Sequence, residues 1–190
     1  MSVLLLIAVL VLLGIGYAWY AGIVRKKNPV GEALGGVDVQ LTQRRDLVPN
    51  VLAVAKRFLS HERELLEQVT ALRARAAQPA SLSDPAALKA KFDAEAQLGG
   101  GLEKLFAVAE GYPELKSDAT MVEAQRTYQE VETNIAAARR FYNSSVGDLR
   151  NSVQTFPGPL LAGLAGVGEL PPFFEADASA REPVNAADHL

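Results

Sequence analysis

The stretch "VDVQLTQRRDLVPNVL", residues 37–52, decides how the chain folds, because it combines a helical apolar pattern with two adjacent arginines. Its apolar residues recur every three or four positions, which is the spacing of one buried helix face. That face must pass through Arg44 or Arg45, so we expect at least one guanidinium at or beside the protein interior. Pro49 cannot bond the carbonyl of Arg45, which predicts a kink and a free acceptor at that carbonyl.

The two arginines have two interpretations that the sequence leaves open. A buried guanidinium needs acceptors, and such a polar layer would fix the register of two helices against each other. Candidate partners lie on the same helix, at Asp38 and Asp46, and on a later helix, at Glu130, Glu132, Tyr142 and Asn143. In the other interpretation, both arginines lie along the edge of the helix, with their apolar stems covered and their charges in water.

Helical spacing extends from this stretch in both directions along the chain. It predicts a first helix from residue 34 to about residue 77. Asp84 followed by Pro85 is typical of a helix start, so a second helix is expected from there to about Glu110. Residues 99–101 are three glycines inside this second helix, and they predict a kink or a local break.

A third helix collects apolar residues at helical spacing over 121–156 and ends at Pro157. No segment alternates apolar and polar residues as a strand does, so we expect an all-α fold: an antiparallel bundle of three long helices over residues 37–176. After Pro157, glycines and prolines predict a short helical or irregular cap, and residues 177–190 are expected to be a disordered tail. Five apolar residues are expected to dock the cap: Leu160, Leu161, Leu164, Phe173 and Phe174.

The N-terminal segment is the most apolar part of the chain. Residues 3–24 carry no charge and would be about 33 Å long as a helix, which is enough to cross a bilayer. Three aromatic residues (Tyr17, Trp19 and Tyr20) and the basic run 25–27 follow near one end, as expected at a membrane interface. We therefore predict a membrane anchor over residues 1–27, rather than a cleaved signal peptide, because "MSVLLL" has no basic residue.

The flanks of this anchor predict its orientation and its link to the bundle. The basic run after the span places the bundle in the cytoplasm by the positive-inside rule. Residues 28–36 contain a proline and three glycines, so we expect a hinge there. Gly14, Ala18 and Gly22 form a small-residue row that would allow a second copy to approach, although such rows are also common in membrane helices without dimerisation.

Composition excludes some function classes and offers no catalytic constellation. The net charge of −3 argues against a nucleic-acid partner, and the absence of cysteine excludes disulfides and thiolate sites. His61 lacks a second histidine at metal-binding spacing, and the carboxylates are spread over the predicted helix surfaces. We therefore expect no catalytic residue, no metal and no cofactor, and we do not expect an enzyme.

Four segments, in this order behind an apolar N-terminus, resemble the LemA family of bacterial membrane-anchored proteins: "DVQLTQRRDLVPNVL", "FAVAEGYPELKSD", "RTYQEVETNIAAARRFYN" and "FPGPLLAGLAG". The resemblance covers about residues 38–175. It implies a long antiparallel helical bundle at the membrane, in a family with no established enzymatic activity and with links to envelope processes and, in one magnetosome branch, to membrane remodelling. Its motifs indicate structural or interaction roles for Asp38, Gln40, Arg44, Arg45, Asp46, Pro49, Asn50, Glu132, Arg139, Arg140, Tyr142 and Asn143.

Function is expected to follow from this architecture. The main hypothesis is a single-pass protein of the bacterial cytoplasmic membrane that crosses the bilayer through residues 3–24 and presents its bundle to protein partners in the cytoplasm. The alternative is a membrane-remodelling protein, for which the small-residue row and the apolar "LLAGLAGVG" are the relevant features. An envelope hydrolase would require a pocket with convergent polar groups.

Overall fold

The regular structure of this chain is entirely helical over the residues that the computed structural model describes, 2–175. The predicted all-α class is therefore confirmed for these residues, and the predicted tail at 177–190 lies outside them. In chain order the helices are α1 (Ser2–Phe58), α2 (Arg63–Ala76), α3 (Pro85–Ala109), α4 (Pro113–Lys116), α5 (Ala119–Gln154) and α6 (Gly158–Leu161).

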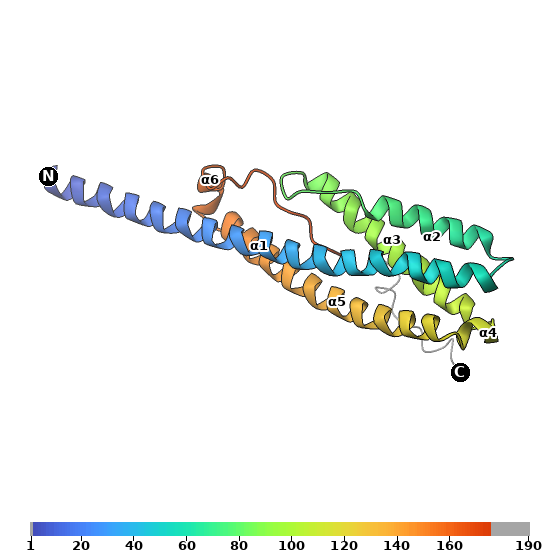
Figure 1. Ribbon diagram of the computed structural model, residues 1–190. Helices are drawn as coiled ribbons and strands as arrows, with labels where there is room; N and C mark the ends of the chain where they lie inside the picture. Colours follow the sequence, from blue (N-terminus) through green and yellow to red (C-terminus); the bar gives the residue numbers. More distant parts are fainter. Residues whose placement is uncertain (1, 176–190) are drawn as a thin grey trace, which may run out of the picture.

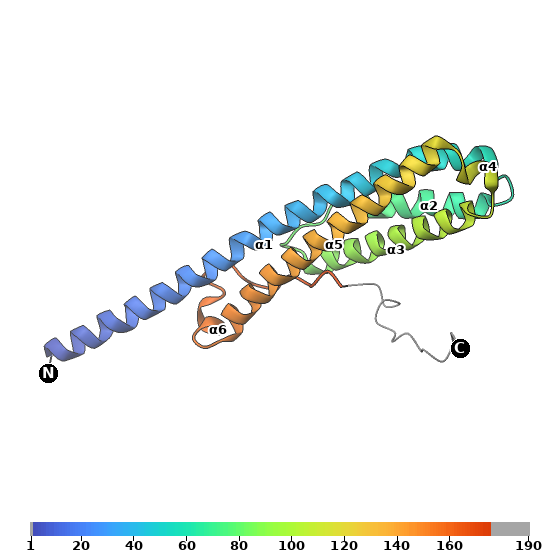
Figure 2. The ribbon, with the colours of Figure 1, turned by 90° about the horizontal axis from the view of Figure 1, so that it is seen from below.

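The four longer helices lie alongside one another in alternating directions (Figures 1 and 2). α1 packs against α5 along much of its length, and α2 packs mainly against α3. The short helix α4 turns the chain from α3 into α5 at one end of the bundle. At the other end α6 contacts both α1 and α5, and the N-terminal part of α1 projects beyond it (Figure 2).

The bundle has four long helices instead of the predicted three, because the first predicted helix is divided in two. α1 ends at Phe58, and a turn over residues 59–62 reverses the chain into α2. This reversal brings Leu65 and Val69 into the core that α1 and α3 share, where an unbroken helix would have carried them into solvent. The apolar spacing hides the turn, because Leu59 before it and Leu66 after it are two helical turns apart in sequence.

The hinge predicted at residues 28–36 is wrong as a break, because α1 is helical through the whole segment. Val30, Ala33 and Leu34 are buried against the rest of the bundle. Burial of this face outweighs the low helix propensity of Pro29 and of the neighbouring glycines. The apolar N-terminal segment is thus joined to the bundle by continuous helix.

Helix α3 confirms its predicted start and corrects its predicted interruption. The side chain of Asp84 accepts a hydrogen bond from the backbone N–H of Ala87 at 2.9 Å, and Pro85 occupies the first turn. The helix then continues without a break through residues 99–101. Asp118 caps α5 in the same way, through the N–H groups of Thr120 and Met121.

Only part of the predicted cap docks on the bundle. Phe174 is buried and stacks on Phe92 with ring centroids 4.3 Å apart, and Leu161 packs against the same core. Leu160 and Leu164, by contrast, are 71% and 74% exposed, so the prediction that they dock is wrong. Leu160 lies in α6, and Leu164 lies in the turn that follows it.

The first part of α1 is the one segment among residues 2–175 that is long and apolar enough to cross a membrane. None of that apolar stretch is buried within the structure. Further along, from Ile23 to Ala55, the same helix contributes buried residues to the bundle core. A single helix therefore has an uncovered apolar part and a part packed into the folded domain.

Candidate functional site

The centre of the bundle contains a buried ionic cluster around Arg44. Only 3% of Arg44 is exposed, and its guanidinium bonds Glu95 of α3 and Glu132 of α5 at once. The distances are 2.7 Å from Nη2 to Glu95 Oε2 and 3.0 Å from Nη1 to Glu132 Oε1. Nη2 also donates to the backbone carbonyl of Glu95 at 2.6 Å. Arg44 thus ties three helices together, and among the six candidate partners named from the sequence it bonds Glu132.

Arg45 completes the cluster from its edge. Its Nη1 bonds the other carboxylate oxygen of Glu95, which is 0% exposed, while its Nη2 donates to Thr42. The interpretation with a buried guanidinium is therefore confirmed for Arg44, and the one with both charges in water is wrong, because the side chain of Arg45 is 14% exposed and bonds the buried Glu95. Glu95 lies between two guanidinium groups, which offsets the cost of burying its charge.

The carbonyl that Pro49 leaves free is used as a hydrogen-bond acceptor. Pro49 has no N–H to donate to Arg45, and α1 nonetheless continues through it to Phe58. The Nε of Arg73, on α2, donates to this carbonyl at 2.9 Å. The predicted free acceptor is confirmed, and it attaches α2 to α1 beside the ionic cluster.

The cluster divides the core into two apolar parts, and the pKa values of Arg44 and of the neighbouring Tyr128 are raised. One apolar cluster lies toward the turn between α1 and α2, and the other lies toward α6. Burial acts to lower the pKa of Arg44, but Glu132 and Glu95 outweigh it and raise that pKa above its ordinary value. Burial, together with the charges of Glu132 and Glu103, raises the pKa of Tyr128, whose hydroxyl donates to the carbonyl of Gly99 at 3.2 Å.

A second polar group on α5 holds the C-terminal segment. The Asn143 side chain donates to the carbonyl of Phe174 at 2.9 Å and accepts from its N–H at 2.8 Å. The hydroxyl of Tyr142 donates to the carbonyl of Pro172 at 2.9 Å. The guanidinium of Arg139 lies over the Phe174 ring, 6.0 Å from its centroid. These contacts fix the last described residues along the bundle.

The arrangement of helices, ionic cluster and C-terminal segment spans the region that a family comparison recognises. The family model described as "LemA family" matches residues 33–187. The chain belongs to the LemA family. A search of curated proteins gives no match to it. Membership is consistent with a membrane-associated protein, and the resemblance predicted from the four sequence segments is confirmed.

The remaining family-motif residues of this LemA protein are dispersed. Asp38 pairs with Lys91 of α3 at 2.7 Å, so it is not a partner of the arginines. Gln40 is half-buried on α1. The other motif residues are exposed on the bundle surface: Asp46, Pro49, Asn50 and Arg140. The structure therefore brings together Arg44, Arg45 and Glu132 as one site, brings Arg139, Tyr142 and Asn143 to the C-terminal segment, and leaves the rest apart.

Sequence reasoning missed Glu95 and Lys91, the two charged residues that α3 contributes to the interior. Both fall in the apolar spacing of that helix, between Leu88 and Leu98. A charged residue within an apolar stripe is the same signal that singled out Arg44. Applied to α3, it would have identified the second side of the cluster.

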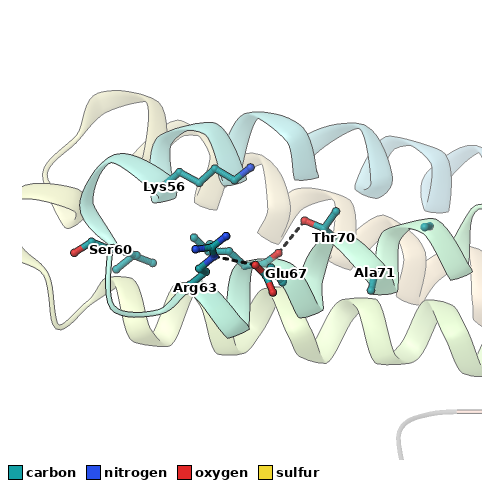
Figure 3. Close-up of a pocket in the computed structure, with 9 residues that line it drawn as sticks. Lys56, Ser60, Arg63, Glu67, Thr70 and Ala71 are labelled. Carbon is teal, nitrogen blue, oxygen red and sulfur yellow. Dashed lines mark hydrogen bonds and ion pairs between the residues drawn. The ribbon is translucent and has the colours of Figure 1, made fainter.

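Two hollows of the LemA bundle are candidate binding sites, one beside the ionic cluster and one beside the turn at residues 59–62. One, of about 200 Å³, adjoins the ionic cluster and is lined by residues that include Arg44, Glu132 and Arg139. The other, of about 610 Å³, lies between the end of α1 and the start of α2 (Figure 3). Two of its polar side chains bond within α2: Arg63 bonds Glu67 at 3.0 Å, and Thr70 donates to the carbonyl of Leu66 at 2.8 Å. Residues 2–175 contain no cluster of metal-ligating side chains.

Proposed function

We propose that this protein is a single-pass anchor protein of the bacterial cytoplasmic membrane that presents its helical bundle to protein partners without acting as an enzyme. The observation that carries the proposal is α1, whose apolar first part has no cover within the structure while its later part belongs to the bundle core. Residues 3–24 would cross the bilayer, because an apolar helix whose large side chains are exposed from Val3 to Tyr17 is stable in lipid and costly in water. The end of this span, from Trp19, also contacts the C-terminal segment of the bundle.

The residues that flank the span support this placement. Tyr17 is 73% exposed and Tyr20 is 36% exposed, and both lie near the end of the apolar stretch, where amphipathic rings favour the headgroup layer. The exposed residues Arg25 and Lys26 follow, and basic residues are retained on the cytoplasmic side. The bundle therefore lies in the cytoplasm and the N-terminal residues lie on the other side.

The ion pairs of the buried carboxylates support the non-enzymatic part of the proposal. The carboxylate of Glu95 is engaged by two arginines, and that of Glu132 is engaged by Arg44. Carboxylates that are neutralised in this way are poorly suited to acid or base catalysis, which requires a group free to exchange its proton with a substrate. The cluster stabilises one arrangement of the helices, and the exposed bundle surface remains available to partners.

Two measurements test the anchor and its orientation. After carbonate extraction of membranes, the full-length chain is expected in the membrane pellet. Because the chain has no cysteine, single substitutions report on topology with a membrane-impermeant maleimide applied to intact cells. Ser2→Cys is expected to be labelled and Val122→Cys to be labelled only after lysis. Recovery of the intact chain in the soluble fraction, or the reverse labelling pattern, would overturn the proposal.

The proposed partners are tested separately by crosslinking in intact cells. Photoreactive groups at exposed bundle positions, such as Asn50 and Arg140, are expected to capture the same proteins in replicate cultures. Capture of nothing above the level seen with a group at the buried Leu98 would argue against an interaction role. Purified full-length protein that tubulates liposomes without any partner would instead favour membrane remodelling.

A further inference from the structure

Three large apolar side chains are exposed together where α5 ends and α6 begins. Phe156 is 77% exposed, and Leu160 and Leu164 of the same short segment are exposed to a similar degree. The exposed N-terminal part of α1 is accounted for by the bilayer, but this second group belongs to the folded bundle. A cluster of apolar side chains with no cover marks a contact with another apolar phase or molecule.

Specific hydrogen bonds fix the position of this segment along α1. The indole N–H of Trp19 donates to the carbonyl of Ser152 at 3.4 Å, near the end of α5. The ammonium of Lys27 donates to the carbonyls of Gly166 and Ala165 at 2.8 and 3.4 Å. Residues 152–166 are therefore held beside residues 19–27, the end of the proposed span and its basic flank. Figure 2 shows α6 beside this part of α1.

The direction of α5 places Phe156 and the residues just after it closer than Ser152 to the N-terminal end of α1. α5 runs antiparallel to α1, so the residues that follow Ser152 lead toward the N-terminal end of α1 (Figures 1 and 2). Phe156 follows Ser152, the residue bonded by Trp19, by four positions, so it lies near the level of Trp19. The chain returns through α6 and reaches Lys27 again only at residues 165 and 166.

The chemistry of the segment suits the boundary of a bilayer. No charged residue occurs between Arg150 and Glu169. The backbone is closed on itself by hydrogen bonds from Gly166 N to Gly163 O and from Val167 N to Ala162 O, with Gly166 at φ +70°. This is a Schellman closure, which satisfies the terminal carbonyls of the helical turn without water. Lys27 satisfies two further carbonyls.

We propose that residues 156–164 insert Phe156, Leu160 and Leu164 into the interfacial layer of the same leaflet from which α1 emerges, so that the bundle touches the membrane at a second point. This inference rests on the proposed span, because the span sets the depth of the loop. A second copy of the chain is the less suitable occupant, since a bilayer crossed by residues 3–24 already surrounds this level of α1. The hydrogen bonds from Lys27 hold residues 165 and 166 close to the headgroup layer, where the polar backbone groups of this segment stay in contact with water and headgroups.

Site-directed fluorescence in lipid tests this contact on the full-length chain. Single cysteines at Leu160 and Leu164 are labelled with an environment-sensitive dye in phosphatidylcholine–phosphatidylglycerol vesicles, and lipids with a quencher near the headgroup or an aqueous quencher are then added. Val122→Cys is the matched control, because Val122 is also an exposed apolar residue of the bundle but lies near the start of α5, at the far end. Leu10→Cys reports on the span itself.

The expected result is blue-shifted emission at residues 160 and 164 that the lipid-borne quencher largely removes, whereas residue 122 responds only to the aqueous quencher. Quenching of residues 160 and 164 from water, with residue 10 quenched from lipid, would overturn the inference and leave the anchor standing. Protection from both quenchers would show coverage by a second copy and would also overturn it. If residue 10 itself is quenched from water, the proposed span fails, and this inference fails with it.

Discussion

Replacement of two neighbouring glycines in α3 by alanine should change the stability of the bundle in opposite directions. Glycine inside a helix costs about 1 kcal/mol relative to alanine, so an alanine without clashes should be stabilising. At Gly100 a Cβ atom would have nothing within 4 Å. At Gly99 it would lie 2.9 Å from Nη1 of Arg44, the atom that bonds Glu132. Both substitutions gain the higher helix propensity of alanine, but only Gly99→Ala disturbs the ionic cluster.

The difference in unfolding free energy between the two variants follows from the weakening of the ion pairs of Arg44 in Gly99→Ala. Removal of one partner from a buried ion pair costs about 3–5 kcal/mol. In Gly99→Ala the guanidinium is displaced but not removed, so we expect a cost of about 3 kcal/mol and a net destabilisation of about 2 kcal/mol. Gly100→Ala should stabilise by about 1 kcal/mol. A gap of about 3 kcal/mol corresponds to about 6–12 °C in melting temperature for a chain of this size.

The assay is thermal unfolding of the full-length chain in one detergent, followed by far-ultraviolet circular dichroism. The decisive control repeats Gly99→Ala in an Arg44→Ala background, where the clash is gone and the substitution should become stabilising. Such a double-mutant cycle isolates the interaction between the two positions. If Gly99→Ala stabilises the wild-type chain as much as Gly100→Ala does, the close approach of Arg44 to this helix is refuted.

Three further predictions concern the ionic cluster and the C-terminal segment. Arg44→Ala should destabilise the bundle by about 3–5 kcal/mol in chemical denaturation, while Arg140→Ala, at an exposed position, should change it by less than about 0.5 kcal/mol; equal effects would contradict the burial of Arg44. The raised pKa of Tyr128 means that the unfolded chain loses this proton first, so stability should fall as pH rises above about 10. Tyr128→Phe should weaken that dependence in melting curves, and an unchanged dependence would count against it. Asn143→Ala removes both hydrogen bonds to Phe174 and should cost about 1–3 kcal/mol locally, which faster amide exchange at Phe174 would reveal; unaltered exchange there would show that the contact does not hold the segment.

Sequence patterns predicted the features of this fold that depend on local chemistry. The start of α3 was predictable because Asp84 and Pro85 stabilise a helix start wherever they occur. The free carbonyl of Arg45 was predictable for the same reason, since Pro49 removes its donor in any helix. The apolar spacing also placed residue 44 or 45 at or beside the interior, but it did not decide between burial and a position along the edge of the helix.

The features that sequence patterns missed depend on contacts between distant segments. The turn at residues 59–62 contains no glycine or proline, and only the docking of α2 on α3 gives it an advantage over a longer helix. Burial of Val30 and Leu34 keeps α1 helical through the predicted hinge. The role of Gly99 is visible only once Arg44 lies across α3. In each case packing outweighs a local preference of about 1 kcal/mol per residue.

The partner of Arg44 could be predicted only in part. Glu132 was named because α5 was expected to face α1, and the structure confirms that contact. Glu95 lies on a helix whose position relative to α1 could not be derived from spacing alone. Its complete burial depends on guanidinium groups from another helix, so neither Glu95 nor Arg44 can be understood apart from the other.

The unbroken course of α1 has a mechanical consequence. A helix of 57 residues is about 86 Å long, and about 50 Å of it lies beyond residue 24. Membrane helices lean by about 20° on average, and at that angle a stiff rod of this length carries its distal tip about 17 Å sideways. If residues 3–24 cross the bilayer as proposed, changes in bilayer thickness that alter this tilt would therefore move the turn at residues 59–62 sideways. Insertion of flexible glycines between residues 27 and 30 would uncouple the tilt of the membrane-spanning part of α1 from the displacement of the turn at residues 59–62.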